Sequence, residues 1–416
     1  MIRFIHTADI HFGVENYGII DPKTGIHTRL LDFERALNYC IDYAIEHNVD
    51  FFLFAGDAYK TTNPSPTQQR LFVKCFLRLH AAGIPAVIVV GNHDNPLSFG
   101  KSNTLDLFSD LPLTGFHVIS KPRAFILETK SGPVNIVGIP WPNRTTITSS
   151  QHHMFKSSSQ LTDYISESTI TILNHLIKPL DKELPSILTG HLTVSSGIFS
   201  GSEKRAIYGT DPLFLPSQLA IEPFDYVGLG HLHRHQNLNP NGHAPVVYSG
   251  SPERIDFGER KEEKGFCDVT LHSKTKTTYE FIKTPTRPFF QVDVQLKDNE
   301  THTAQILNAL KAFEIQNAII KIVYKVPANT PDMVDLSIVQ KACNAALDLV
   351  GIIPVHEPKN RERRSHLKID MDLETMLELY FQSKPEYVKD KATLIAKALE
   401  LKDELAQQAF HDETSS

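Results

Sequence analysis

Residues 2–11 (IRFIHTADIH), 50–57 (DFFLFAGD) and 85–94 (PAVIVVGNHD) share one pattern: an apolar run followed by a short motif of glycine, aspartate, asparagine or histidine. Each run has the length and composition of a buried strand. The segments between them, 29–47 and 66–82, carry apolar residues at helical spacing. This strand–helix–strand–helix–strand order favours parallel strands with helices on their faces.

The pattern changes in the next part of the chain. Residues 124–128 and 134–139 flank a turn at 130–133, which predicts a hairpin. We also expect a helix at 160–182 and strands at 186–188, 226–229, 246–248 and 266–271. We therefore predict an α/β (α+β) fold in which a mixed sheet sandwich is flanked by helices.

Residues 284–288 (TPTRP) indicate a domain boundary. We expect residues 1–284 to form the first domain. Residues 285–370 predict a small α/β domain, with strands at 289–296, 318–326 and 352–356 and helices at 304–313 and 334–349. Residues 371–416 predict helices only.

The composition sets broad limits on the class of protein. The 416 residues suggest two or three domains. With 41% hydrophobic and 22% charged residues, the chain has the balance of a globular protein. The formal net charge of -6 argues against a protein held on DNA by bulk charge alone. It leaves room for binding through a local basic groove or bound cations.

The four cysteines lie far apart and form no CxxC pair: Cys40, Cys75, Cys267 and Cys343. This disfavours a disulfide framework or a zinc ribbon and fits a reducing compartment. The N-terminal sequence lacks the pattern of a signal peptide, and no apolar run approaches the ~18 residues of a membrane span. We expect a cytoplasmic protein without a membrane segment.

Five motifs carry the chemistry, and each follows an apolar strand: Asp9-x-His11, Gly56-Asp57, Gly91-Asn92-His93-Asp94, Gly190-His191 and Gly230-His231-Leu232-His233. Groups at the carboxyl ends of parallel strands converge on one edge of a sheet. The glycines allow sharp turns and close approach of the backbone to a ligand.

These residue types suit two divalent cations. Carboxylate oxygen, amide oxygen and neutral imidazole together fit Mn²⁺, Fe²⁺ or Zn²⁺. If the backbone is extended, Asp9 and His11 point to the same face, and so do His231 and His233. Asp57 is suited to bridge two ions, and a pair roughly 3.5–4 Å apart activates water for attack on a phosphoryl group. His93 is suited to protonate the leaving oxygen.

Each motif has a less specific interpretation. Taken alone, a DxH, GD or GH dipeptide is more often part of a turn, Asn92 a turn residue, and His191 a surface histidine. The joint occurrence of all five, in order and each at the end of a strand, favours the metal site.

The ordered motifs resemble the calcineurin-like metallophosphoesterase superfamily. More narrowly, HTADIHFG (6–13), AGDAYK (55–60), VVGNHD (89–94), TGHLT (189–193), GLGHLH (228–233) and YSGSPERIDFGE (248–259) resemble the bacterial SbcD family, the nuclease subunit of SbcCD. The resemblance covers the first domain closely, the second by layout, and the terminal helices by character only.

The resemblance implies a ligand set. One ion would be held by Asp9, His11, Asp57 and His233, and the other by Asp57, Asn92, His191 and His231. His93 would be the proton donor and Asp94 would orient it. Many relatives have a second histidine at the position of Lys60, which puts that histidine's role in doubt here. Lys60 would contact a phosphate as a point charge or be a solvated loop residue.

The resemblance also implies double-stranded DNA as substrate, Mn²⁺ as the metal, homodimerisation and an SbcC-like coiled-coil ATPase partner. The second domain would cap the cleft. Its basic run would meet a phosphate backbone or form a solvated charged loop: Lys359, Arg361, Arg363, Arg364 and Lys368. After the GSPER motif, Arg254, Arg260 and Lys261 would contact phosphate or pair with Glu259 and Glu262.

The tail carries two apolar stripes: Leu373, Met376, Leu377, Tyr380 and Phe381, then Leu394, Ala398, Leu401 and Leu405. They would pack on the chain's own body or, as the resemblance implies, bind the ATPase partner. The leading hypothesis is a metal-dependent DNA exonuclease and endonuclease. The alternatives are a phosphatase or phosphodiesterase acting on small nucleotides, and a non-catalytic scaffold, which the intact ligand set disfavours.

Overall fold

The computed structural model describes residues 1–95, 102–110, 112–143, 158–201, 211–297, 301–328, 330–356, 371–382 and 389–413. The chain divides into two compact units. The first contains Met1–Asp293, Ile306–Val323 and Asp335–Ile353, and the second contains Val294–Gln305, Tyr324–Val334 and Pro354–Ser416. The boundaries expected after residues 284 and 370 stay predictions.

The first six-stranded sheet has the order β14-β13-β1-β2-β3-β4. Its strands are β1 (Ile2–Thr7), β2 (Phe51–Phe54), β3 (Ala86–Val89), β4 (Phe116–Ile119), β13 (Gly265–Ser273) and β14 (Lys276–Lys283). Strands β1 to β4 are parallel, and β13 runs antiparallel to β1. Strands β1, β2 and β3 are the strand–helix alternation that the sequence predicts.

The second six-stranded sheet has the order β11-β12-β10-β7-β6-β5. Its strands are β5 (Arg123–Thr129), β6 (Gly132–Ile139), β7 (Ser186–His191), β10 (Tyr226–Gly230), β11 (Gln236–Asn237) and β12 (Val246–Tyr248). Strands β6, β7, β10 and β12 are parallel. Strand β5 pairs with β6 in the predicted hairpin.

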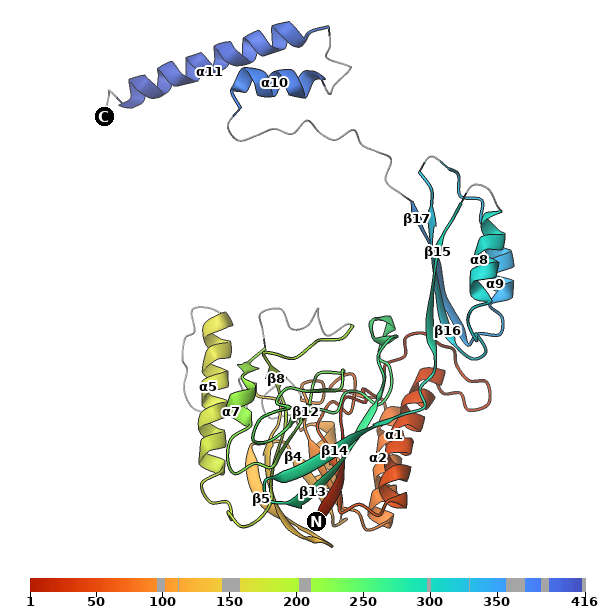
Figure 1. The fold of residues 1–416 in the computed structure, drawn as a ribbon, viewed down its shortest axis with the longest axis vertical. Helices are drawn as coiled ribbons and strands as arrows, with labels where there is room; N and C mark the ends of the chain where they lie inside the picture. Colours follow the sequence, from red (N-terminus) through yellow and green to blue (C-terminus); the bar gives the residue numbers. More distant parts are fainter. Residues whose placement is uncertain are drawn as a thin grey trace. The chain divides into compact units, whose positions relative to one another are not determined.

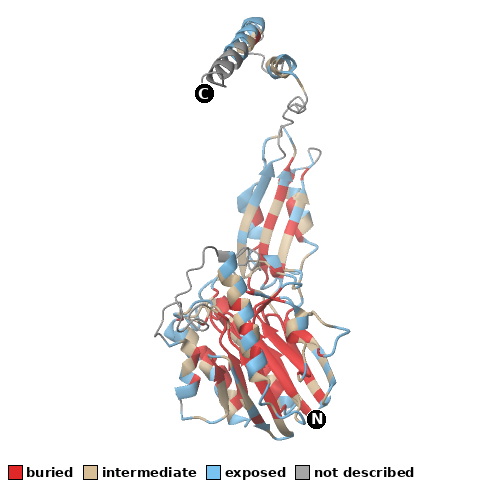
Figure 2. Ribbon diagram, turned by 90° about the vertical axis from the view of Figure 1, so that its left-hand side faces the viewer, coloured by how far each residue is buried: buried red, intermediate tan, exposed pale blue. Residues whose placement is uncertain are grey.

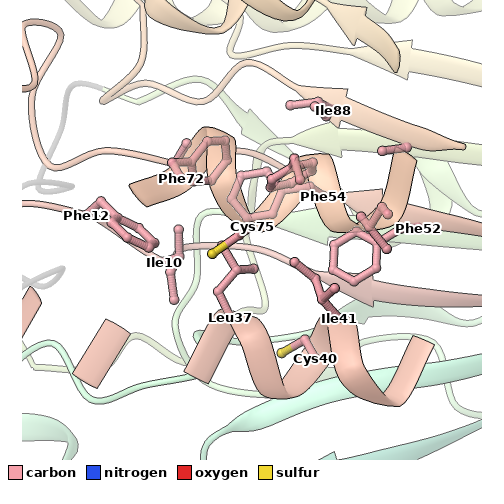
Figure 3. Packing of buried hydrophobic residues seen from close by; sticks show 14 of the residues in the cluster. Ile10, Phe12, Leu37, Cys40, Ile41, Phe52, Phe54, Phe72, Cys75 and Ile88 are labelled. Atoms are coloured by element: carbon pink, nitrogen blue, oxygen red, sulfur yellow. The ribbon is translucent and has the colours of Figure 1, made fainter. Parts of the chain in front are cut away.

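The two sheets pack face to face, with helices outside (Figure 1). Between the sheets, Phe4, Leu53 and Val87 of the first meet Ile136 and Ile187 of the second. Helices α1 (Thr28–Glu46) and α2 (Pro66–Ala81) cover the outer face of the first sheet, where their apolar residues pack on Phe52, Phe54 and Ile88 (Figure 3). The mixed sandwich flanked by helices is thus confirmed.

Helices α5 (Ser158–Leu176) and α7 (Pro216–Leu219) contribute to the apolar cluster on the other face of the second sheet. Short elements complete the first unit: η1 (Thr104–Asp106), α3 (Leu107–Asp110), β8 (Thr193–Val194), β9 (Leu213–Phe214) and η2 (Phe257–Glu259). The inner strands of both sheets are the most continuously buried segments, among them β2, β3, β7, β10 and β12 (Figure 2). They therefore form a rigid base for the loops at their ends.

Beyond residue 288 the chain forms a three-stranded sheet of order β15-β16-β17. It consists of β15 (Phe289–Gln295), β16 (Ile319–Val326) and β17 (Asp348–His356), with helices α8 (His302–Leu310) and α9 (Leu336–Ala342). The final helices are α10 (Leu373–Gln382) and α11 (Lys391–Glu413). No helix in the described ranges combines the length and apolarity that crossing a membrane requires.

Two predicted helices end several residues early in the structure, and five strands were missed. The helix expected at 160–182 ends at Leu176, three residues before Pro179, whose ring cannot continue a helix. The helix expected at 334–349 ends at Ala342, because the Leu347 N–H donates to the Ala318 carbonyl and leads the chain into β17. The strands that were not predicted are β4, β8, β9, β11 and β14.

Candidate metal centre

The predicted residues meet where the two sheets end together. Asp9 and His11 follow β1, Asp57 follows β2, and Asn92 follows β3. From the second sheet come His191 at the end of β7 and His231 and His233 after β10. Neither sheet alone would supply the set, so the site depends on the packing of one sheet against the other.

The backbone at the site is left-handed rather than extended. Asp9 has φ 57°, His11 48°, Asp57 55° and His231 105°. The condition of an extended backbone, under which side chains two positions apart would share a face, is therefore not met at Asp9, His11 and His231. Left-handed conformations cost on the order of 1–3 kcal/mol each and persist where the surroundings enforce them. Here the Asp9 N–H donates to the Gly56 carbonyl at 2.9 Å and the His11 N–H to the Asp57 carbonyl at 3.1 Å.

Two glycines leave room for the side chains of the site. A Cβ at Gly56 would lie 2.3 Å from His191 Nδ1, and one at Gly91 would lie 2.1 Å from Asp57 Oδ1. Both distances are far below any van der Waals contact. A side chain at either position would displace a candidate ligand.

The first half of the cluster contains Asp9, His11, Asp57 and His233. The Nε2 atoms of His11 and His233 are 3.1 Å apart, and His11 Nε2 is 3.5 Å from Asp57 Oδ2. Ligand atoms of Asp9, His11 and His233 all lie within 4.8 Å of one another. His11, Asp57 and His93 form another such group.

The second half is built around Asp57 and Asn92. His191 Nε2 lies 3.3 Å from Asp57 Oδ2 and 3.0 Å from Asn92 Oδ1. His231 Nδ1 lies 3.2 Å from the same Asn92 oxygen. Ligand atoms of Asp57, His191 and His231 fall within 4.8 Å of one another, so Asp57 belongs to both halves.

The outer nitrogens of the three second-sheet histidines face acceptors. His191 Nδ1 is 2.8 Å from the Ala55 carbonyl, and His233 Nδ1 is 2.8 Å from Glu259 Oε1. His231 Nε2 is 3.4 Å from Asp211 Oδ2. A neutral imidazole that donates outward presents a lone pair inward.

When the histidines are neutral, as metal ligands are, the inward atoms are nearly all electron-pair donors. Lone pairs of Nε2 atoms and carboxylate or amide oxygens repel one another at these distances unless a cation lies between them. Oxygen and imidazole donors of this mixture suit divalent metal ions. The residues present thus fit divalent metals, as the sequence predicts.

The pKa values of the buried carboxyl and imidazole groups are shifted by burial and by one another's charge. Burial raises the pKa of Asp9 to about 7, although the His231 N–H donates to both its oxygens at 3.0 and 3.1 Å. Burial alone would also raise the pKa of Asp57, but His191 and His93 hold it well below its usual range. The pKa of His191 would be lowered by burial, but Asp57 raises it to about 9. Added positive charge would keep both carboxylates ionised.

His93 lies at the edge of the cluster. Its backbone N–H donates to Asp57 Oδ1 at 2.9 Å, and its Nδ1 is 2.8 Å from the Lys60 carbonyl. Its ring meets the His11 ring edge-on, with centroids 4.9 Å apart. With Nδ1 donating to the carbonyl, Nε2 is the ring nitrogen left for chemistry.

Asp94 does not contact His93 in the way that an orienting role would require. The buried carboxylate accepts the backbone N–H groups of Ala58, Tyr59 and Gly91 at 3.2, 3.1 and 3.0 Å. Within the described residues, no hydrogen bond joins it to His93. Burial and then the charge of Asp57 raise its pKa to about 6. Asp94 braces the loops after β2 and β3, and the Lys60 carbonyl holds His93.

The side chain of Lys60 is exposed, so a phosphate contact and a solvated position both stay open. Arg254 is different. Its guanidinium donates to the Glu262 carbonyl at 3.0 Å, to the Arg287 carbonyl at 3.2 Å and to Thr286 Oγ1. These bonds tie the GSPER segment to residues 286–287. They occupy the donors of Arg254 and therefore disfavour a contact between Arg254 and a phosphate.

The basic run from Lys359 to Lys368 lies outside the described residues.

The sequence reasoning missed four residues beside the cluster: Trp141, Asp211, Glu259 and Lys264. Trp141 is the single tryptophan of the chain, and its ring centroid lies 4.9 Å from that of His231. Glu259 lies within the quoted segment 248–259, which was the available signal. Asp211 and Lys264 gave no signal, because only the fold brings them to His231 and to Glu259.

The chain is similar in sequence to proteins that are already known. The family model "Calcineurin-like phosphoesterase" matches residues 2–235. The D subunit of the nuclease SbcCD from Escherichia coli K12 is 28% identical over 296 residues, which cover 68% of each chain. The Bacillus subtilis protein of the same name is 24% identical over 371 residues, covering 87% of this chain and 88% of its own. A dimetal phosphatase structure from Danio rerio has 11% identity and a TM-score of 0.37, over 67% of this chain and 98% of that one.

Proposed function

Because the chain belongs to the calcineurin-like phosphoesterase family and is related to the SbcD component of SbcCD nucleases, we propose that it is a metal-dependent DNA exonuclease and endonuclease. It would be the nuclease component of an SbcCD-type, ATP-dependent repair complex that processes double-strand ends and hairpins. The observation that carries the proposal is the convergence of imidazole lone pairs and carboxylate oxygens on two adjoining positions that share Asp57.

The proposed ligand set follows the two halves of the cluster. Asp9, His11, Asp57 and His233 would hold one ion, and Asp57, Asn92, His191 and His231 would hold the other. Mn²⁺ is the proposed metal, because mixed oxygen and imidazole donors suit it. When bound, such a metal pair activates a water nucleophile and stabilises the attacking and leaving oxygens of a phosphoryl group.

The protein's own groups would then have distinct tasks. His93 would protonate the leaving oxygen through Nε2, while the Lys60 carbonyl accepts from Nδ1 and fixes the ring. The His93 N–H donates to Asp57 and thereby ties the acid to the bridging carboxylate. Asp94 would hold the two loops in register through their backbone N–H groups.

The proposed partners are double-stranded DNA, a second copy of the chain and an SbcC-like coiled-coil ATPase. The tail supports the last of these, because apolar side chains lie exposed on both final helices. Tyr380 and Leu401 are each 48% exposed and Leu394 is 38% exposed. Exposed apolar side chains on amphipathic helices are typical of docking surfaces. We propose the cytoplasm as the compartment.

A nuclease assay tests the proposal. The purified chain with Mn²⁺ should degrade linear duplex DNA and open hairpins, and a coiled-coil ATPase with ATP should stimulate it. Nitrophenyl phosphodiesters serve as the comparison substrate. Hydrolysis of the small ester without cleavage of DNA, with or without the partner, would favour the small-nucleotide phosphodiesterase instead.

A further inference from the structure

A buried ion pair lies directly behind His233. Glu259 is fully buried, and its Oε1 is 2.8 Å from His233 Nδ1. Its Oε2 is 2.8 Å from Lys264 Nζ and accepts the Ile255 N–H at 2.8 Å. Both oxygens of the carboxylate therefore have partners, one of which is the imidazole.

Lys264 is itself only 2% exposed. Besides Glu259, its ammonium donates to the His233 carbonyl at 3.0 Å and to Glu262 Oε2 at 3.2 Å. A buried carboxylate is costly unless charged or hydrogen-bonding groups contact it. Lys264 thus stabilises the Glu259 carboxylate, and it also holds the backbone of the residue whose ring Glu259 contacts.

We propose that the Glu259–Lys264 pair is a positioning device that keeps the proton of His233 on Nδ1, so that Nε2 offers its lone pair to a divalent cation. The inference rests on the proposed function, in which His233 is a ligand. It makes the affinity of one ion depend on two residues that touch no metal.

The other second-sheet histidines are held differently. His191 Nδ1 faces a backbone carbonyl, and Asp211 lies 3.4 Å from His231 Nε2. A carbonyl stays an acceptor whatever its surroundings. The side chain of Glu259, in contrast, is held in place for Nδ1 by the contacts of its other oxygen with Lys264 and the Ile255 N–H, and Lys264 also holds the His233 carbonyl. Removing Lys264 should therefore weaken the ion at His233 more than the ion at His191 and His231.

The test is a metal titration of the full-length chain, using Mn²⁺ with isothermal calorimetry. The wild type should bind two ions. Lys264→Met and Glu259→Gln should each weaken one binding step roughly 10- to 100-fold, the usual effect of losing a group that orients a ligand, and leave the other step within about threefold. Glu262→Gln is the matched control, because Glu262 contacts the same lysine but not the histidine; both its affinities should stay within about twofold.

A double variant separates positioning from general destabilisation. If Lys264 acts through His233, adding Lys264→Met to His233→Ala should change the affinities no further. Affinities close to wild type in folded Lys264→Met and Glu259→Gln proteins would overturn the inference while leaving the nuclease proposal intact. A wild type that binds no divalent cation would instead overturn the proposed function.

A measurement on the unmodified protein covers the case in which the variants fail to fold. Long-range ¹H–¹⁵N correlation spectra of histidine-labelled, metal-free chain report which ring nitrogen carries the proton. The signal of His233, identified by its loss in a folded His233→Gln protein, should show a protonated Nδ1 and a bare Nε2. A proton on Nε2 alone would contradict the proposal.

Discussion

His11 Nε2 and His233 Nε2 lie 3.1 Å apart, although 222 positions separate the two residues in the chain. His233 Nδ1 faces Glu259, so its Nε2 presents a lone pair toward His11. The fold thus brings together two groups whose close approach is favourable only with a cation or a shared proton between them. Stability and metal content should consequently be linked.

Metal loading should stabilise the protein. At a free Mn²⁺ concentration 100 times the dissociation constant, one site that exists only in the folded state adds about 2.7 kcal/mol to the free energy of unfolding. Thermal unfolding of chelator-treated chain should therefore shift upward on titration with Mn²⁺. His233→Ala should reduce the shift, and an unchanged Tm across the titration would contradict a metal site formed on folding.

His93→Ala should keep both metal ions and lower kcat by about 10²–10⁴, the usual contribution of a general acid. The measurement is metal stoichiometry together with DNA cleavage. The matched control is His80→Ala, because His80 Nδ1 also lies 3.0 Å from a backbone carbonyl, that of Thr114, but outside the site. Unchanged turnover in His93→Ala would remove His93 from the acid role.

Tryptophan fluorescence should report metal binding. The chain has one tryptophan, Trp141, whose ring centroid lies 4.9 Å from that of the candidate ligand His231. Mn²⁺ bound at His231 should quench its emission, because the ion is paramagnetic and close. A chelator should restore the signal, and His231→Ala should reduce the quenching. Emission insensitive to Mn²⁺ at full occupancy would argue against an ion at His231.

Acid should weaken the ion pairs that the buried Asp32 of α1 forms with Arg29 and Arg287. Burial alone would raise the pKa of Asp32, but Arg287 and Arg29 hold it below its usual range, with Arg287 Nη2 at 2.6 Å and Arg29 Nη1 at 2.8 Å. A carboxyl with a depressed folded pKa stabilises the protein above its unfolded pKa of about 3.9 and loses this contribution as pH falls through the folded value.

Asp32→Asn should accordingly cost about 3–5 kcal/mol near pH 7, because it leaves the fully buried Arg29 short of a counter-charge. The difference from wild type should shrink below about pH 4. Denaturant unfolding in the presence of a chelator measures it. Asp42→Asn on the same helix is the control: the Asp42–Arg78 pair is 47% and 39% exposed, so its loss should cost less than about 1 kcal/mol.

Deleting the residues after Met371 should spare Mn²⁺-dependent nuclease activity and abolish binding to the coiled-coil ATPase. The deleted helices α10 and α11 supply no residue of the candidate site. Pull-down with the partner, alongside a nuclease assay of the truncated chain, tests this. Retained partner binding would show that the tail is not the docking element.

The sequence by itself determined the parallel strands β1 to β3, the helices α1 and α2 that cover them, and the set of motif residues. Those signals are local: an apolar run of strand length, helical spacing, and glycine followed by aspartate or histidine. The capping box of Ser65 and Gln68 at the start of α2 is local in the same way. Such features depend on neighbours a few positions apart.

Only the tertiary structure decided how those residues are used. The left-handed backbone of Asp9, His11 and Asp57 depends on hydrogen bonds between loops of neighbouring strands. Asp94 accepts backbone N–H groups because the loop after β2 lies beside it. The Glu259–Lys264 pair reaches His233 because the fold packs these segments together. These are contacts between distant residues, and hydrophobic periodicity, which reports only which face of an element is buried, carries no information about them.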